Sequence, residues 1–232
     1  MSVFSSFKRT NYSSACKIRL EIKSKLTKAF IFQNYAGAIG EEMKWENKTY
    51  PKARNPVRFN IHGHAHGLTF TCYRGMKLLL SNRACQIIAN AINSSSLKCN
   101  FHVWAWVFMP EHVHLLVYPF DNHYSISEIL RAIKQSSSRR IISEVKRRKP
   151  ECLGRLETEL KKPYYRFWQD GGGYDKNFTD QNAILYQINY IHENPVRRGL
   201  VGNAIDWQWS SARYWTNEKR SPVEMNSSYL VM

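Results

Sequence analysis

Two histidines two positions apart, His112 and His114, are the residues of this chain whose spacing most clearly suggests chemistry. They lie in an apolar run, residues 103–117, that predicts a β-strand. Because side chains alternate across a strand, both imidazoles leave the same face, with roots roughly 7 Å apart. Two imidazoles on one face can share one divalent cation, and a polar pair among apolar residues needs such a partner. The pair therefore predicts a metal site.

A tyrosine and an asparagine four positions apart, Tyr190 and Asn194, offer the other groups that such a site would use. Residues 181–193 predict a helix, on which positions four apart share a face. A tyrosine phenol has an ordinary pKa of about 10, so it needs a nearby cation or base to act as a nucleophile at neutral pH. The carboxamide oxygen of Asn194, combined with two imidazoles, favours Mg²⁺ or Mn²⁺. On spacing alone, a packing role for Tyr190 stays open.

A denser group of histidines, His62, His64 and His66, stands at the start of the predicted strand 65–73. Glycines flank the group and no acidic residue is near it in the sequence. We interpret it as a polar strand end or a close backbone approach, with a metal site as the alternative.

The charge of the chain indicates its class of partner. The formal net charge is +16, which favours a polyanion, and 43% hydrophobic residues are enough for a packed core. No apolar stretch reaches the ~20 residues of a membrane span. The 5 cysteines show no CxxC spacing, which indicates reduced thiols rather than disulfides or a zinc ribbon. We expect a cytoplasmic nucleic-acid-binding protein with no membrane partner.

A basic stretch, residues 131–149, precedes the candidate nucleophile, and two arginines follow it. Such a stretch is often only a solvated helix face, but here it accompanies a high total charge and favours phosphate contacts. The candidate DNA-binding residues are Arg131, Lys134, Arg139, Arg140, Arg197 and Arg198. The aromatic residues of the segment 164–168 either stack on unpaired bases or belong to the core.

The elements that must position these residues alternate along the chain. Strands are predicted over residues 65–73, 99–108, 112–118 and 164–168. Helices are predicted from residue 82 to about 94, from 126 to about 148 and from 181 to about 193, where Pro195 ends the last one. The order predicts an α/β protein of the α+β kind, an antiparallel sheet with packed helices.

The domain organisation follows from composition. Residues 56–216 predict one domain, since their length suits a single core. Residues 1–55 form a basic N-terminal extension of unassigned role, rich in Lys and Asn. Residues 217–232 are expected to be a fraying C-terminal tail.

Four motifs stand in a fixed order along the chain. They are MPEHVHLLV at 109–117, FWQDGGGYDKN at 167–177, YIHENPVRRGLV at 190–201 and DWQWSSA at 206–212. Together they strongly resemble the REP-associated tyrosine transposases, bacterial relatives of the single-tyrosine HUH transposases of insertion sequences. The resemblance runs from about residue 56 to residue 214. It implies an HUH endonuclease-like fold with a ferredoxin-like core.

The resemblance also implies roles for individual residues. His112 and His114 would bind the divalent cation, Asn194 would be the third metal ligand, and Tyr190 would be the nucleophile. The implied reaction is cleavage and strand transfer of single-stranded or hairpin DNA, in which the tyrosine keeps the 5′-phosphate and a 3′-hydroxyl is freed. No organic cofactor is implied. Because the tyrosine acts within its own chain, a monomer is expected, with a dimer as the alternative.

A rival interpretation from another class is a non-catalytic protein that binds DNA hairpins and regulates. It would use the same basic surface. Binding alone, however, requires none of the four residues His112, His114, Tyr190 and Asn194, so their joint presence favours the enzyme. A metal-dependent nuclease that uses water would form no covalent adduct with DNA.

Overall fold

The computed structural model describes residues 58–159, 164–216 and 221–226. These residues belong to one compact unit, Thr49–Ser227. The predicted N-terminal extension, residues 1–55, lies outside the described residues. No helix of the described part has the length and apolar character that crossing a membrane requires.

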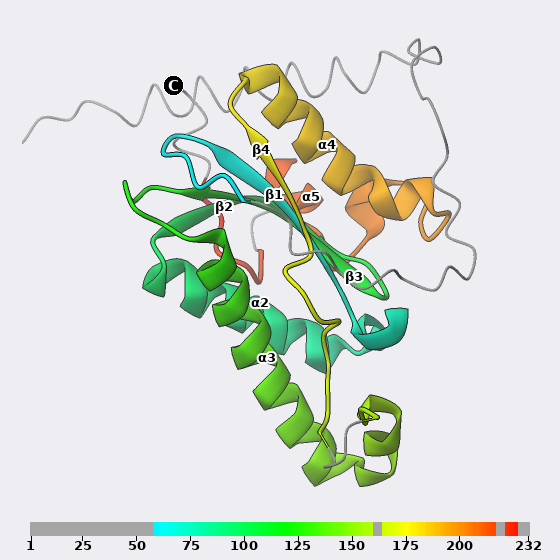
Figure 1. The fold of residues 1–232 in the computed structure, drawn as a ribbon. Helices are drawn as coiled ribbons and strands as arrows, with labels where there is room; N and C mark the ends of the chain where they lie inside the picture. The colour runs from blue at the N-terminus through cyan, green and yellow to red at the C-terminus, as the bar shows by residue number, and fades with distance from the viewer. Residues whose placement is uncertain (1–57, 160–163, 217–220, 227–232) are drawn as a thin grey trace, which may run out of the picture. The chain divides into compact units, whose positions relative to one another are not determined.

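A four-stranded antiparallel sheet forms the centre of the structure, with strand order β2-β3-β1-β4 (Figure 1). Its strands are β1 (Ala65–Thr71), β2 (Phe101–Phe108), β3 (His112–Pro119) and β4 (Tyr174–Phe178). The strands are rich in aromatic and β-branched residues, which suit a pleated, half-buried surface. The βαββαβ order and this strand arrangement confirm the predicted antiparallel sheet with a ferredoxin-like core.

Three long helices cover the sheet: α2 (Asn82–Lys98), α3 (Ile126–Arg148) and α4 (Gln181–Arg197). Helices α2 and α3 pack side by side on one face, and α4 packs on the other (Figure 1). Each helix begins at an N-cap, since the side chains of Ser81, Ser125 and Asp180 each accept a hydrogen bond from a backbone N–H of the first turn. The short helix α5 is Ala212–Trp215, and the 3₁₀ helices are Tyr73–Gly75, Leu78–Leu80, Pro150–Leu156 and Ala204–Asp206.

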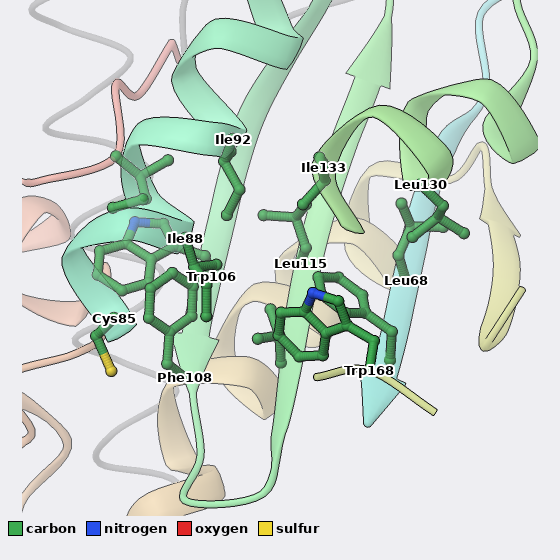
Figure 2. Packing of buried hydrophobic residues seen from close by; sticks show 14 of the residues in the cluster. Leu68, Cys85, Ile88, Ile92, Trp106, Phe108, Leu115, Leu130, Ile133 and Trp168 are labelled. Atoms are coloured by element: carbon green, nitrogen blue, oxygen red, sulfur yellow. The ribbon is translucent and has the colours of Figure 1, made fainter. Parts of the chain in front are cut away.

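The main hydrophobic core lies between the sheet and the α2–α3 layer (Figure 2). Strand β3 contributes its odd-numbered residues Val113, Leu115 and Val117 to this core. Since side chains alternate along a strand, the even-numbered residues His112 and His114 leave the opposite face, which α4 covers. The alternation thus directs both histidines to the helix that carries Tyr190.

The fourth strand is not where the sequence pattern placed it. Residues 164–168 form only the isolated bridges of Tyr165 to Glu157 and of Trp168 to Cys72. Phe167 and Trp168 turn into the main core, so this part of the segment has a core role rather than a base-stacking one. The glycines at 171–173 then turn the chain, and β4 pairs with β1. Gly173 has a φ of +69°, and an added Cβ would lie 2.2 Å from the carbonyl oxygen of Thr69, so the turn requires glycine.

The prediction that Pro195 ends the last helix was wrong by about one turn. Helix α4 includes Pro195 and continues to Arg197. It ends in a Schellman motif, in which the N–H of Leu200 donates to Pro195 O and the N–H of Gly199 donates to Val196 O. Gly199 has a φ of +65°, the conformation that this motif requires. Because Pro195 removes only one backbone donor, the glycine four positions later sets the end of the helix.

Residues that follow α4 in the chain cover the outer edge of β2. Ser211 N donates to Trp106 O, the N–H of Phe108 donates to Trp209 O, and the N–H of Asn226 donates to Val103 O. Val223 is fully buried in the main core. The expected fraying of residues 217–232 therefore does not apply to the described part 221–226, which packs on β2 and α2.

Candidate active site

The two predicted histidines meet on the α4 face of the sheet. Their Nε2 atoms lie 2.9 Å apart and their ring centroids 4.6 Å apart. The outer nitrogens also have partners: His112 Nδ1 lies 3.0 Å from a carboxylate oxygen of Glu111, and His114 Nδ1 lies 2.8 Å from Thr69 Oγ1. An ionised carboxylate only accepts hydrogen bonds, so His112 carries its proton on Nδ1 and presents a lone pair at Nε2. In metal-binding histidines, the ring nitrogen that does not bind the metal typically donates to a carboxylate in this way.

The spacing of the two Nε2 atoms fits one divalent cation. Neighbouring ligands of one cation with bonds of about 2.1 Å lie roughly 3 Å apart, so two nitrogens 2.9 Å apart can share one ion. Among the residues that the structure describes, no group of three or more His, Cys, Asp and Glu side chains could hold a metal. The third ligand predicted from the sequence, Asn194, carries a carboxamide and so does not belong to these residue types.

Burial keeps His114 in the neutral form that metal binding requires. Desolvation, followed by repulsion from His112, lowers the pKa of His114 to about 3. An imidazole must be deprotonated at the ligating nitrogen before it can bind a cation. His114 is therefore uncharged at neutral pH, so its ring does not repel a cation.

Tyr190 reaches this pair from helix α4. Its ring centroid lies 6.0 Å from that of His114, edge to face, and the Arg197 guanidinium lies 5.1 Å from the centre of the tyrosine ring. Asn194 is buried one turn later, and its amide nitrogen donates to the backbone carbonyl of Tyr190 at 2.7 Å. The convergence of a mid-chain strand with a late helix, expected from the sequence, is present.

Glu111 and Thr69 complete the surroundings of the histidines, and the sequence analysis named neither. Arg198, at the end of α4, donates to the same carboxylate oxygen of Glu111 that contacts His112. Burial opposes ionisation of Glu111, but its hydrogen bonds with His112 and Arg198 outweigh that effect and lower its pKa to about 2. A signal for Glu111 was available, since it directly precedes His112. Thr69 has no such signal, because only strand pairing places it opposite His114.

The aromatic motif at 206–212 anchors helix α4. His192, buried two positions after Tyr190, has its Nε2 atom 2.8 Å from Ser211 Oγ. Ser211 also accepts from the backbone N–H of Trp106 on β2. Desolvation lowers the pKa of His192 to about 3, so this histidine is neutral. The motif thus ties the tyrosine helix to the sheet.

The basic residues of α3 lie on the face of the sheet opposite Tyr190. Arg139 and Arg140 are exposed and line a groove of about 370 Å³ between α2 and α3. Arg131 is exposed and forms an ion pair of 3.5 Å with Glu128. Lys134 differs from these three, because its ammonium donates to the carbonyls of Gln169 and Gly171, both at 2.8 Å, and burial lowers its pKa to about 8. The structure therefore groups Arg197 and Arg198, but not the α3 residues, with the tyrosine.

The earlier histidine group forms hydrogen bonds at the start of β1. His66 is fully buried between Asp175, 2.9 Å from its Nδ1 atom, and the Tyr124 hydroxyl, 2.7 Å from its Nε2 atom. His64 Nδ1 lies 3.0 Å from the amide nitrogen of Asn177. These contacts correspond to the polar strand end that we expected there.

Comparison with one solved structure supports this fold. The structure of a REP-associated tyrosine transposase bound to a REP hairpin matches with a TM-score of 0.56 and 20% identity, over 76% of this chain and 93% of that one. A crystal structure from Deinococcus radiodurans R1, described as a putative transposase, matches with a TM-score of 0.38 and 19% identity, over 62% of this chain and 97% of that one. No curated protein matches the chain.

The sequence model of the family "Transposase IS200 like" matches residues 61–194, which is more than half of the chain. The matched range contains both histidines, Tyr190 and Asn194. The chain belongs to the IS200-like transposase family. This agrees with the resemblance noted in the sequence, and it identifies a transposase with a DNA-processing class of activity.

Proposed function

We propose that this transposase is a metal-dependent single-strand DNA endonuclease and strand transferase that acts on hairpin repeat DNA, with Tyr190 as its nucleophile. The observation that carries the proposal is the convergence of Tyr190 on the histidine pair, with 6.0 Å between the Tyr190 and His114 rings. Because both come from one chain, a monomer suffices. The enzyme would act on DNA in the bacterial cytoplasm.

His112, His114 and Asn194 are the residues that would hold Mg²⁺ or Mn²⁺. The amide nitrogen of Asn194 is used in the bond to Tyr190 O, so its carbonyl oxygen is the atom suited to a hard cation. A cation there would polarise the scissile phosphate and offset charge on its oxygens. Two neutral imidazoles and one amide would leave the positive charge of the cation undiminished, since none of the three ligands is anionic.

Tyr190 would perform the covalent step. Its phenol loses a proton and the oxygen attacks phosphorus, forming a 5′-phosphotyrosine. The bond from phosphorus to the 3′-oxygen breaks, and that oxygen leaves as a 3′-hydroxyl after gaining a proton. A second 3′-hydroxyl can reverse the step and join a new strand, because the phosphotyrosine conserves the bond energy. The Arg197 guanidinium lies 5.1 Å from the centre of the Tyr190 ring and would supply positive charge beside the reacting phosphate.

The DNA partner is supported by charge and by the solved relative. The chain has a net charge of +16, and the similar transposase is bound to a REP hairpin. Arg197 and Arg198 would contact phosphates near the cleaved bond. Residues of the opposite face, Arg131, Lys134, Arg139 and Arg140, would contact the hairpin stem.

A denaturing gel tests the nucleophile. Labelled single-stranded hairpin DNA incubated with the protein and Mg²⁺ should give a covalent band that Tyr190→Phe abolishes. Tyr186→Phe is the matched control, since Tyr186 lies one turn earlier on the same helix and is 70% exposed. The control should retain the band. An adduct that survives Tyr190→Phe and disappears with Tyr186→Phe would reassign the nucleophile.

The same gel separates the enzyme from the non-catalytic hairpin binder. His112→Ala should abolish cleavage and leave much of the DNA binding, because phosphate contacts dominate affinity. A protein that binds the hairpin tightly but gives no covalent band with any cation would be a binder. Cleavage without a covalent band would indicate attack by water.

A further inference from the structure

Glu111 joins the two halves of the site through a single carboxylate oxygen. This oxygen lies 3.0 Å from Nδ1 of His112 and also accepts a hydrogen bond from the guanidinium of Arg198. The side chain of Glu111 is 16% exposed and that of His112 is 17% exposed, so water screens the pair only partly. Strand β3 and the end of helix α4 are thus linked by charge-assisted hydrogen bonds.

A continuous path of hydrogen bonds runs from the tyrosine to the histidine pair. Asn194 donates its side-chain amide to the carbonyl of Tyr190, and the N–H of Arg198 donates to the carbonyl of Asn194 at 3.2 Å. The Arg198 side chain then reaches Glu111, which contacts His112. Each step joins neighbours in space, and the step from Arg198 to Glu111 crosses from helix to strand.

We propose that Glu111 is a positioning residue that fixes His112 for metal binding, and that Arg198 links this carboxylate to the nucleophile helix. The proposal rests on the proposed function and adds two roles to it. Glu111 holds the proton of His112 on Nδ1, which leaves the Nε2 lone pair directed at the cation. Arg198 sets the position of the end of α4 relative to β3, so the tyrosine and the metal ligands keep one relative placement.

The two histidines have unequal partners. His112 contacts a carboxylate, whereas His114 contacts the neutral hydroxyl of Thr69. A negatively charged partner strengthens a histidine ligand more than a neutral one does, because it stabilises positive charge on the ring. Glu111 thereby brings an anionic carboxylate close to a metal site whose proposed ligands are all neutral. Arg198, predicted from sequence as a phosphate contact, has this carboxylate as its partner.

Metal affinity tests the role of Glu111 without any DNA cleavage. Mn²⁺ binding to the whole protein can be followed by electron paramagnetic resonance for the parent, Glu111→Ala, Glu111→Gln and Glu128→Gln. We expect Glu111→Ala to weaken Mn²⁺ binding by about 10- to 100-fold. The Mn²⁺ affinity of Glu111→Gln should fall between those of the parent and Glu111→Ala, since glutamine keeps a hydrogen-bond acceptor but loses the charge. Glu128→Gln, which removes a charge on α3, should bind as the parent does.

Nitrogen NMR of the imidazoles distinguishes positioning from a general structural effect. In the metal-free parent, His112 should show one tautomer with the proton on Nδ1, and in folded Glu111→Ala it should show a mixture. Parent-like Mn²⁺ affinity together with an unchanged tautomer in Glu111→Ala would overturn the role given to Glu111.

Arg198 is tested by the rate of covalent adduct formation. Arg198→Gln should slow the adduct while weakening Mn²⁺ binding less than Glu111→Ala does, and Arg198→Lys should restore part of the rate. Arg155→Gln, which removes one exposed positive charge from the 3₁₀ helix after α3, is the charge-matched control. A loss in Arg198→Gln confined to DNA affinity would leave Arg198 with its phosphate contact alone and overturn the linking role.

The two levels of the proposal fail separately. A parent protein that forms no adduct, yet binds Mn²⁺ in a manner that depends on Glu111, would remove the proposed function and retain the positioning role. A parent that forms the adduct, with Mn²⁺ binding that does not depend on Glu111, would retain the proposed function and remove the positioning role.

Discussion

At the scale of single residues, the hydrogen bond at one ring nitrogen of each histidine determines what the other ring nitrogen can do. His112 and His114 have their Nδ1 atoms close to Glu111 and Thr69, which leaves Nε2 for a cation. Sequence spacing was sufficient to predict the histidines, because alternation along a strand is local. The partners were not predictable in the same way. Thr69 is 45 positions away from His114, and only the pairing of β1 with β3 brings them together.

His192 makes a testable contribution to acid sensitivity. Burial lowers its pKa from 6.5 to about 3, so the folded state holds it neutral while the unfolded chain takes up a proton below about pH 6.5. Folding stability from this residue is therefore complete above that pH and is lost as the pH falls toward 3. At about pH 5 the loss amounts to about 2 kcal/mol of unfolding free energy.

Urea unfolding at about pH 7.5 and about pH 5 checks this expectation. His192→Gln should be less stable than the parent at the higher pH and should lose less stability between the two values. Some acid dependence will remain, because His114 has a pKa lowered in the same direction. His123→Gln, at an exposed position, is the control. Equal losses in His192→Gln and the parent would contradict the assignment.

At the scale of elements, the sequence predicted which elements exist better than where they begin and end. Helix α3 and strand β3 were predicted nearly to the residue because caps and alternation are short-range signals. The fourth strand was placed at 164–168, since an aromatic run before glycines favours a strand. The same aromatic residues were needed in the α2–α3 core, and β4 formed after the glycines instead. Helix α4 continues past Pro195 because the Schellman motif at Gly199 determines its end.

Gly173 gives the glycine motif a physical role that the sequence left unassigned. Its φ of +69° and the 2.2 Å from an added Cβ to Thr69 O mean that alanine is strained in two ways. We expect Gly173→Ala to lower the unfolding free energy by about 2 kcal/mol, measured by chemical denaturation. Gly202→Ala, where an added Cβ meets nothing within 4 Å, should change it little. Equal changes in unfolding free energy for the two substitutions would show that the turn at Gly173 accommodates a side chain, against this expectation.

At the scale of the whole molecule, the basic residues that the structure describes lie on both faces of the sheet. Arg197 and Arg198 accompany the tyrosine, whereas Arg139 and Arg140 lie at the groove between α2 and α3. Composition predicted a polyanionic partner but not this division, because charge counts contain no geometry. A hairpin that contacts both faces would have its stem and its cleaved strand on different sides of the protein.

Salt dependence of hairpin binding tests the α3 face. The double variant Arg139→Gln/Arg140→Gln should lower the slope of log affinity against log salt by ~2, about one for each lost phosphate contact. Lys134→Gln is the informative comparison, because its ammonium already donates to two backbone carbonyls. A parent-like slope and lower thermal stability in Lys134→Gln would give that lysine a structural role. An unchanged slope in the double variant would place the stem elsewhere.

The outer edge of β2 has a consequence for self-association. An exposed strand edge is a template on which a neighbouring chain can add a strand, the usual start of fibrils and precipitates. Here the carbonyls of Val103 and Trp106 and the N–H of Phe108 are already bonded to residues between 209 and 226 of the same chain. Sheet extension by a second molecule at this edge first requires that stretch to detach. Trp209, Ser211 and Asn226 therefore protect this edge of the sheet against association with a second molecule.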